Sequence, residues 1–236
     1  MAALPKTGAM AGPPGWRWLG RLGFAQADQL NHLDQLATQQ DGQPRLLAFE
    51  PRSAVLTYTP RAQVADDIAR QLEELHRRQI APVPVQRGGQ AMLHLPGQLV
   101  VLVALPLGQT GVRGMVCQLL QVTALVARQF GSTPEVRADR DAGLWCATGE
   151  HPAKLAAIGL CVVQQVAGHG VALNVAIDPA RAAGLTLCGH ANARYASLAA
   201  PAALSVAVVA QAWMQAWVAN YSGEDARLRR PTCEIL

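Results

Sequence analysis

Three polar segments interrupt an otherwise apolar sequence and hold residue types that could carry out chemistry. The first, residues 87–98, begins with an arginine and two glycines, whose amides can approach a ligand closely and donate to a carbonyl or carboxylate oxygen. The second begins at Lys154, which enters an apolar run, and continues with the histidine and asparagine of residues 169–174. The third is Leu187-Cys188-Gly189-His190, in which glycine follows a cysteine at the end of an apolar run. That position is typical of an exposed thiol, and an exposed thiol can act as a nucleophile.

Each segment also has a purely structural interpretation. Cysteine is among the residue types that bury most readily, so Cys188 on its own could be a core residue. A histidine on an apolar segment, such as His94 or His169, is usually hydrogen-bonded inside the core. An Arg-Gly-Gly sequence can simply form a turn. A prediction of function must therefore rest on the three segments together.

Lysine is nearly absent from the chain. Eighteen arginines accompany only two lysines, Lys6 near the N-terminus and Lys154 in the body of the sequence. A composition that uses arginine almost everywhere has kept one lysine among residues expected to fold. Either Lys154 is a surface residue without a specific role, or the protein needs an ammonium group at this position.

The elements that position these segments follow from hydrophobic periodicity. Some segments have apolar residues at helical spacing, such as Leu30, Leu33 and Leu36, and other segments are short apolar runs typical of strands. Both kinds of segment occur along the chain, which is typical of an α+β protein with a mixed sheet flanked by helices. Residues 99–107 are apolar throughout, as in a strand buried on both faces. The predicted helices cover 25–38, 62–79, 113–130 and 202–220; the predicted strands cover 45–58 in two runs, 99–107, 143–147, 155–164 and 170–177, with a turn at 179–184.

Composition excludes several classes of protein. Of the 236 residues, 50% are hydrophobic and 15% are charged, which supplies a core for a single domain. The net charge of +4 comes from scattered arginines, which argues against nucleic acid and favours an acidic protein partner. The five cysteines are odd in number and lack CxxC spacing, so we expect no metal site and a cytoplasmic protein. The apolar runs at 99–107 and 199–219 are too short or too interrupted to span a membrane, and the N-terminal stretch does not resemble a signal peptide.

Taken together, the polar segments resemble one known family. The sequences RGGQAMLHLPGQLV, KLAAIG, HGVALNVAID and LCG occur in the order and spacing of the lipoyl(octanoyl) transferases, which belong to the biotin/lipoate protein ligase fold family. The resemblance covers residues 17–200 and implies the α+β fold of that catalytic domain. The composition of the two ends sets off a flexible N-terminal arm (1–15) and a polar C-terminal tail (222–236), which leaves a single acyltransferase domain (16–221) between them.

The resemblance also implies roles for individual residues. Cys188 occupies the position of the family cysteine that carries an acyl thioester, and Lys154 that of the lysine that pairs with it. His169 and Asn174 are expected to shape the pocket. The acyl-binding residues implied by the family motifs are Arg87, Gly88, Gly89, Gln90, Ala91, Met92, Leu93, His94, Ala157, Ile158, Gly159, Gly170, Val171 and Ala172.

The function implied by the resemblance is transfer of an octanoyl-type acyl group. The donor would be acyl carrier protein, which bears the acyl group on its phosphopantetheine, and the acceptors would be lysines in lipoyl domains of 2-oxoacid dehydrogenases and in the glycine cleavage carrier protein. The family needs no metal or bound cofactor, and its partners are neither nucleic acid nor membrane. Lys154 would favour the Cys188 thiolate, and in its neutral form it could also accept a proton from the incoming lysine.

The sequence departs from the family pattern at several positions. Met92 and Leu93 replace a Thr-Tyr pair, Leu95 replaces a glycine, Leu187 replaces a proline, and a histidine expected near residues 50–59 is missing. Because bulkier apolar groups reshape an acyl pocket, the preferred chain length stays open at this point.

Four alternatives also stay open. A divergent relative could carry a different acyl group or serve a different acceptor. A non-catalytic protein could bind acyl groups or lipoyl domains. An ATP-dependent ligase or a Cys–His hydrolase is less consistent with the sequence, because the ligases do not use a cysteine in this motif and no orienting Asn or Asp for a hydrolase stands at recognisable spacing.

Overall fold

A computed structural model of the chain describes residues 15–221, except for residues 140, 149–150, 191–193 and 200–203. The predicted arm (1–15, apart from Gly15) and the predicted tail (222–236) lie outside the described residues. None of the helices in the described range is both long and apolar enough to cross a membrane.

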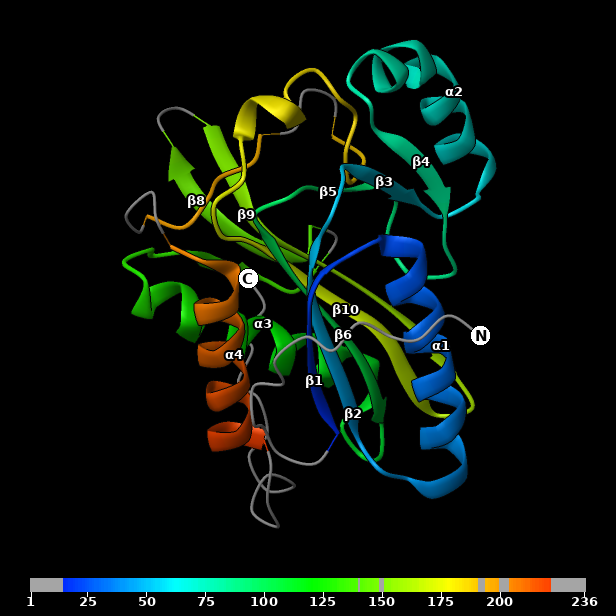
Figure 1. The fold of residues 1–236 in the computed structure, drawn as a ribbon, viewed down its shortest axis with the longest axis vertical. Helices are drawn as coiled ribbons and strands as arrows, with labels where there is room; N and C mark the ends of the chain where they lie inside the picture. Colours follow the sequence, from blue (N-terminus) through cyan, green and yellow to red (C-terminus); the bar gives the residue numbers. More distant parts are fainter. Residues whose placement is uncertain (1–14, 140, 149–150, 191–193, 200–203, 222–236) are drawn as a thin grey trace.

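The centre of the molecule is a seven-stranded mixed sheet (Figure 1). Its strands lie in the order β1-β2-β6-β10-β9-β8-β7; β1 and β2 are parallel, and every other neighbouring pair is antiparallel. The two central strands have almost entirely buried side chains, because helices cover both faces of the sheet. The strands are β1 (Trp16–Leu22), β2 (Arg45–Pro51), β6 (Gln98–Pro106), β7 (Glu135–Arg137), β8 (Gly143–Thr148), β9 (His151–Val163) and β10 (Val166–Asn174).

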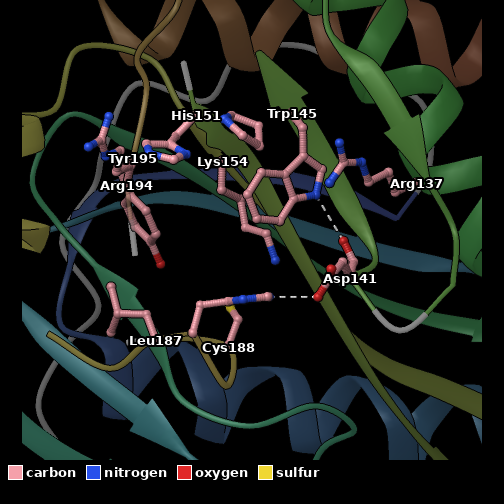
Figure 2. A pocket seen from close by; sticks show the side chains of 11 residues that line it. Arg137, Asp141, Trp145, His151, Lys154, Leu187, Cys188, Arg194 and Tyr195 are labelled. Atoms are coloured by element: carbon pink, nitrogen blue, oxygen red, sulfur yellow. Dashed lines mark hydrogen bonds and ion pairs between the residues drawn. The ribbon is translucent and has the colours of Figure 1, made fainter. Parts of the chain in front are cut away.

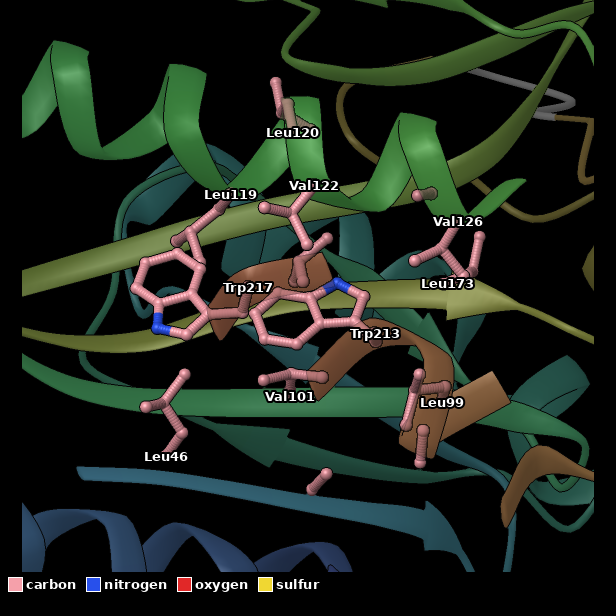
Figure 3. Packing of buried hydrophobic residues seen from close by; sticks show 14 of the residues in the cluster. Leu46, Leu99, Val101, Leu119, Leu120, Val122, Val126, Leu173, Trp213 and Trp217 are labelled. Atoms are coloured by element: carbon pink, nitrogen blue, oxygen red, sulfur yellow. The ribbon is translucent and has the colours of Figure 1, made fainter. Parts of the chain in front are cut away.

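Three helices form the outer layers. Helix α1 (Phe24–Asp41) packs on one face, against β2, β6 and β10, while α3 (Gly111–Gln129) and α4 (Val206–Tyr221) cover the other (Figure 1). The larger core lies under α3 and α4, where the indole rings of Trp213 and Trp217 stack with centroids 5.6 Å apart (Figure 3). Trp213 Nε1 donates to Thr123 Oγ1 of α3, so the buried indole has its hydrogen-bond partner.

A second, smaller sheet lies beside the end of the first. It has the order β4-β3-β5, with β3 (Val55–Tyr58) between β4 (Ala81–Pro84) and β5 (Met92–His94), and α2 (Ala62–Arg77) packs on β4. A separate apolar cluster joins this sheet to the segment that follows the short helix η1 (Pro179–Ala182). That cluster includes the fully buried Leu187, so the small sheet anchors the segment that carries Cys188.

The α+β class and the mixed sheet predicted from the sequence are confirmed, and each predicted helix and strand has a counterpart. Four short strands, β1, β4, β5 and β7, were not predicted. Helix α4 begins at Val206, four residues later than predicted, and β9 begins at His151, so Lys154 lies inside this strand.

The core-facing side of α1 differs from the hydrophobic pattern. Leu33 and Leu36 are exposed, whereas Asn31 and Thr38 are buried. Asn31 donates to the Val103 carbonyl of β6 at 2.8 Å, so its polar side chain is satisfied where it packs on the sheet.

Hydrogen bonds between buried side chains connect the small sheet to the large one. The Arg87 guanidinium donates to Thr57 Oγ1 at 2.9 Å, and the Thr57 hydroxyl lies 3.2 Å from Nε2 of His94. The other ring nitrogen of His94, Nδ1, is 2.8 Å from Oε1 of Gln98.

The same series of contacts continues across the central strands. Gln98 Nε2 donates to Asn174 Oδ1 at 2.8 Å, and Asn174 Nδ2 donates to the Lys154 carbonyl at 3.1 Å. Because the Gln98 amide nitrogen is donating, its oxygen must accept from His94 Nδ1–H, which leaves His94 Nε2 to accept from Thr57. We call this series the buried hydrogen-bond chain; it consists of Arg87, Thr57, His94, Gln98, Asn174 and the Lys154 carbonyl.

The position of His94 in this chain predicts a pH dependence of stability. Burial lowers the pKa of His94 from 6.5 to about 3, so the folded protein holds a neutral imidazole there. The unfolded chain binds a proton below about pH 6.5, so this contribution is present above that pH and is lost as the pH falls towards 3. At about pH 5 the loss amounts to about 2 kcal/mol.

Urea unfolding of the wild type and of His94→Gln, at about pH 7.5 and about pH 5, tests this expectation. The drop in unfolding free energy between the two pH values should be smaller in the variant by about 2 kcal/mol. His32→Gln, on the exposed side of α1, controls for the loss of a histidine. An equal drop in all three proteins would contradict the assignment.

Candidate active site

Cys188 occupies a tight turn. The Leu187 amide donates to the His190 carbonyl at 3.0 Å, and the His190 amide donates to the Leu187 carbonyl at 2.9 Å. Cys188 and Gly189 between them have φ values of +52° and +80°. Positive φ at both central residues defines a type I′ turn, and it is uncommon for a residue with a side chain. A side chain at Gly189 would displace the end of the Gln90 side chain, 2.7 Å away, and the positive φ would strain any residue other than glycine there.

Lys154 reaches the same region from β9. Its register partner on β8 is Trp145, beside a β-bulge between the two strands. The residue is buried, and its Nζ lies over the Trp145 ring, 4.6 Å from the centroid. An indole face is a favourable neighbour for an ammonium group. The backbone of Lys154 is also fixed, because its amide donates to Arg194 O at 2.8 Å and its carbonyl accepts from Ala196.

Cys188 and Lys154 line one cavity of about 400 Å³ (Figure 2). They are 34 residues apart in sequence, so tertiary structure alone brings them together. Figure 2 shows the Lys154 side chain pointing from its strand towards the turn that holds Cys188. The other lining residues are Arg137, Asp141, Trp145, His151, Pro152, Leu187, His190, Arg194 and Tyr195.

Tyr195 brings a phenol to the wall of this cavity. Its hydroxyl oxygen accepts from the Leu93 amide at 3.3 Å, which leaves its own proton available to another acceptor. Burial raises the pKa of Tyr195, so the hydroxyl stays protonated. The Cys188 amide, in contrast, is already used, since it donates to the Ala91 carbonyl at 2.8 Å.

A histidine–carboxylate pair stands at the rim of the cavity. His190 Nε2 and Asp141 Oδ1 are 2.7 Å apart, and the His190 ring meets Trp145 edge to face with centroids 6.1 Å apart. The Asp141 carbonyl accepts from Trp145 Nε1 at 2.9 Å. One residue, Asp141, therefore fixes both the histidine and the indole on which Lys154 lies.

A narrow slot of about 10 Å³ lies between α1 and the central strands. Its glycines permit close packing, because a Cβ on Gly159 would lie 2.9 Å from Arg87 Cδ and 3.0 Å from the Gly88 carbonyl. The Gly88 amide donates to Leu160 O of β9 at 2.7 Å and so holds residues 87–91, the glycine-rich loop, on that strand. The slot is lined by Phe24, Arg87, Met92, His94, Val100, Leu102, Gly159, His169, Gly170, Val171 and Ala172.

Arg87 connects the slot with the cavity. It lines the slot, is almost fully buried, and lies close enough to Cys188 for the charge of a thiolate there to favour the guanidinium. Burial is the largest influence and lowers the pKa of the guanidinium. The side chain is held by hydrogen bonds to the Thr57 carbonyl and hydroxyl and to the Gly88 carbonyl.

The residues expected from the sequence therefore fall into two neighbouring places. Lys154 and Cys188 line the cavity, while eight of the others line the slot: Arg87, Met92, His94, Gly159, His169, Gly170, Val171 and Ala172.

The remaining expected residues line neither space. Gly88, Gly89, Gln90 and Ala91 belong to the loop before β5, and Leu93 lies in β5 itself. Ala157 and Ile158 pack into cores on opposite faces of the sheet, and Asn174 is a link in the buried hydrogen-bond chain. Ile158 points away from the slot because successive residues of a strand face opposite sides.

Several lining residues were given no role from the sequence. Asp141, Trp145 and Tyr195 lie outside the motifs, and no local pattern marks them. His190 stands within LCGH, two residues after the cysteine, and this adjacency was a usable signal. Of the four substitutions noted in the sequence, Met92 lines the slot and Leu187 the cavity, whereas Leu93 and Leu95 are buried in the core of the small sheet.

Comparison with known proteins identifies the same family as the motifs. A family model described as the lipoyl protein ligase A/B catalytic domain matches residues 29–218. An octanoyltransferase of Desulfovibrio desulfuricans is 32% identical over 162 residues, which cover 68% of this chain and 65% of the relative. An octanoyltransferase of Magnetococcus marinus is 40% identical over 144 residues, which cover 60% of this chain and 64% of the relative. The match thus spans slightly less than two thirds of the length of these relatives.

A solved structure gives the same result for the fold. The bi-partite lipoate protein ligase with its E2 lipoyl domain, from the archaeal lipoylation system of Thermoplasma acidophilum, has a TM-score of 0.60 at 15% identity and covers 86% of this chain and 81% of that chain. The expected α+β fold of the lipoate ligase type is confirmed. Since the family model covers most of the chain and includes all four motif segments, the chain belongs to the lipoyl protein ligase A/B catalytic domain family.

Proposed function

We propose that this protein transfers an octanoyl-type acyl group to a lysine of a lipoyl domain, through a thioester on Cys188. The observation that carries the proposal is the shared cavity: a cysteine on an exposed turn and a buried lysine from a distant strand line the same space. The names of the relatives support the acyl group, since both are octanoyltransferases. The donor is an acyl thioester on the phosphopantetheine of acyl carrier protein, and the reaction uses neither metal nor bound cofactor.

In the first half-reaction the Cys188 thiolate attacks the donor thioester. A thiolate is the nucleophile, and the Lys154 ammonium favours it over the thiol. The new thioester forms as the phosphopantetheine thiol leaves. One thioester replaces another, so the exchange is close to isoenergetic and needs no ATP.

The tetrahedral intermediate needs donors for its oxyanion. The Cys188 amide cannot serve, because it already donates to Ala91. The Tyr195 hydroxyl has a free proton and lines the cavity, and among the described residues the Gly189 amide has no hydrogen-bond acceptor of its own. We assign these two groups to the oxyanion.

In the second half-reaction the acceptor lysine attacks the Cys188 thioester and forms an amide. An ammonium is not a nucleophile, so the lysine must first lose a proton to a base. The sequence hypothesis gave this task to Lys154, with His94 or His169 next. The two histidines line the slot, not the cavity, and both ring nitrogens of His94 are already hydrogen-bonded.

The slot is the proposed site of the acyl chain, and its lining side chains must move apart to admit one, because about 10 Å³ holds no more than a water molecule. Its walls are apolar over Phe24, Val100 and Leu102, and Met92 stands where the family pattern has threonine. A divergent relative that carries another acyl group remains the second candidate, and Met92 is the observation that favours it. Loading the protein from carrier proteins of graded acyl length separates the two, because the preferred length should be octanoyl for the first and different for the second.

Cys188→Ser should abolish the acyl-enzyme. A hydroxyl ionises far less readily than a thiol, and an ammonium at ordinary distance does not compensate. The measurement is intact mass after mixing with octanoyl-acyl carrier protein. Cys161→Ser, which removes a thiol on β9 outside the cavity, should form the adduct at the wild-type rate. An adduct that persists in Cys188→Ser would place the nucleophile elsewhere.

Lys154→Met should slow loading of Cys188 by at least about tenfold, because the side chain keeps its length but loses the charge that favours a thiolate. Lys154→Arg keeps the charge and should retain a larger share of the rate. Single-turnover loading, followed by intact mass, measures both. Equal rates in the wild type and Lys154→Met would show that Cys188 does not depend on the ammonium.

Tyr195→Phe should slow the same loading step by about 100-fold, since it removes one hydrogen bond that forms to the oxyanion. The apolar ring and its packing are kept. Tyr58→Phe, on β3 and outside the cavity, is the matched control and should load normally. Loading by Tyr195→Phe at the control rate would exclude the hydroxyl from the oxyanion site.

A further inference from the structure

The histidine–carboxylate pair at the rim of the cavity has the geometry of an oriented base. A carboxylate can only accept, so the 2.7 Å contact means that His190 Nε2–H donates to Asp141 Oδ1. The lone pair of the neutral ring is therefore on Nδ1. No other described residue hydrogen-bonds to that nitrogen, and the residue lies two positions from Cys188.

Accessibility separates His190 from Lys154. The acceptor lysine belongs to another protein and must enter from solvent. Lys154 is buried with its ammonium on the Trp145 ring, whereas 44% of the His190 side-chain surface is exposed. A proton taken up by His190 can pass directly to water, while Lys154, which is 4% exposed, reaches solvent only through the cavity that the acyl group and the acceptor lysine enter.

Trp145 keeps the two groups in a fixed relation. Lys154 Nζ lies on its face, the His190 ring meets it edge to face, and Asp141 binds both the indole N–H and the imidazole. The charge that favours the Cys188 thiolate and the base at the rim therefore both contact one indole ring, the first over its face and the second edge to face. This arrangement allows Lys154 to serve the first half-reaction, beside Cys188, and His190 to serve the second.

We propose that His190, oriented by Asp141, is the base that deprotonates the acceptor lysine, and that Lys154 remains the cation beside Cys188. This inference rests on the proposed function. His190 Nδ1 takes a proton from the lysine ammonium and releases it to solvent. The amine nitrogen then attacks the thioester carbonyl and forms the C–N bond. As the C–S bond breaks, Cys188 leaves as a thiolate beside Lys154, and the nitrogen gives its second proton to His190 Nδ1.

The test separates the two half-reactions. Wild-type protein, His190→Gln, Asp141→Asn, Lys154→Arg and the exposed control His76→Gln are each loaded from octanoyl-acyl carrier protein, and the donor is then removed. The adduct is chased either with lipoyl domain or with hydroxylamine, which is largely uncharged at neutral pH and needs no base. Intact mass follows the loss of the Cys188 adduct in each chase.

His190→Gln should load at the wild-type rate but discharge to the lipoyl domain about 100-fold more slowly, in keeping with the loss of a general base. Its discharge by hydroxylamine should be unchanged, a result that a merely structural defect would not give. Asp141→Asn should show a smaller loss, about tenfold, in the lipoyl chase alone, because the ring keeps its lone pair but loses its orientation. Lys154→Arg, once loaded, should discharge to the lipoyl domain at a useful rate.

Three outcomes would overturn the assignment. Discharge of His190→Gln to the lipoyl domain at the rate of His76→Gln would exclude His190 as the base. Failure of His190→Gln to load would assign the residue to the first half-reaction. A Lys154→Arg adduct that forms but discharges only to hydroxylamine would make Lys154 the base. Absence of an adduct in the wild type is a separate result, because it contradicts the proposed function itself.

Discussion

The buried hydrogen-bond chain from Arg87 to the Lys154 carbonyl is the constraint on which the site depends. It connects the glycine-rich loop, the small sheet and three strands of the large sheet, and each of its links is buried. A buried polar group that loses its partner costs about 1–3 kcal/mol, so the chain favours one arrangement of these elements over any slipped register. The loop beside the slot and the strand that carries Lys154 are held in place by the same set of bonds.

Histidines in this protein divide according to their surroundings. His94 is neutral because burial lowers its pKa to about 3, and both of its nitrogens serve the chain. His169 has a φ of +57° and is fixed by Asn31, which accepts from its amide at 2.9 Å; burial lowers its pKa as well. His190 has a solvent-exposed ring and a carboxylate partner. Interior histidines thus brace the slot, whereas His190 at the rim of the cavity places an imidazole where a proton can be exchanged with water.

The sequence predicted the fold class, the larger elements, and two residues of the cavity. Cys188 and Lys154 were found because their residue types carry the chemistry and their motifs are local. Asp141 and Trp145 could not be found in this way, since their roles arise from contacts with residues far along the chain.

The strand β4 was missed because its sequence, Ala-Pro-Val-Pro, contains two prolines and has no buried face. Proline is tolerated there because the strand lies at the edge of its sheet. The exposed leucines of α1 show how buried polar side chains can replace an apolar stripe when strand carbonyls are within reach.

Tyr195 offers a physical explanation for the substitution of a family tyrosine by Leu93. The family pattern has a tyrosine at the position of Leu93, and in this chain the Leu93 side chain fills the core of the small sheet. Its backbone amide nevertheless donates to the hydroxyl of Tyr195, which enters from a different segment and lines the cavity beside Cys188. A phenol is therefore present at the site although the loop no longer supplies one. Since a hydroxyl stabilises an oxyanion by its position, and not by the segment that carries it, the loss of the loop tyrosine is compatible with an intact acyl-transfer site.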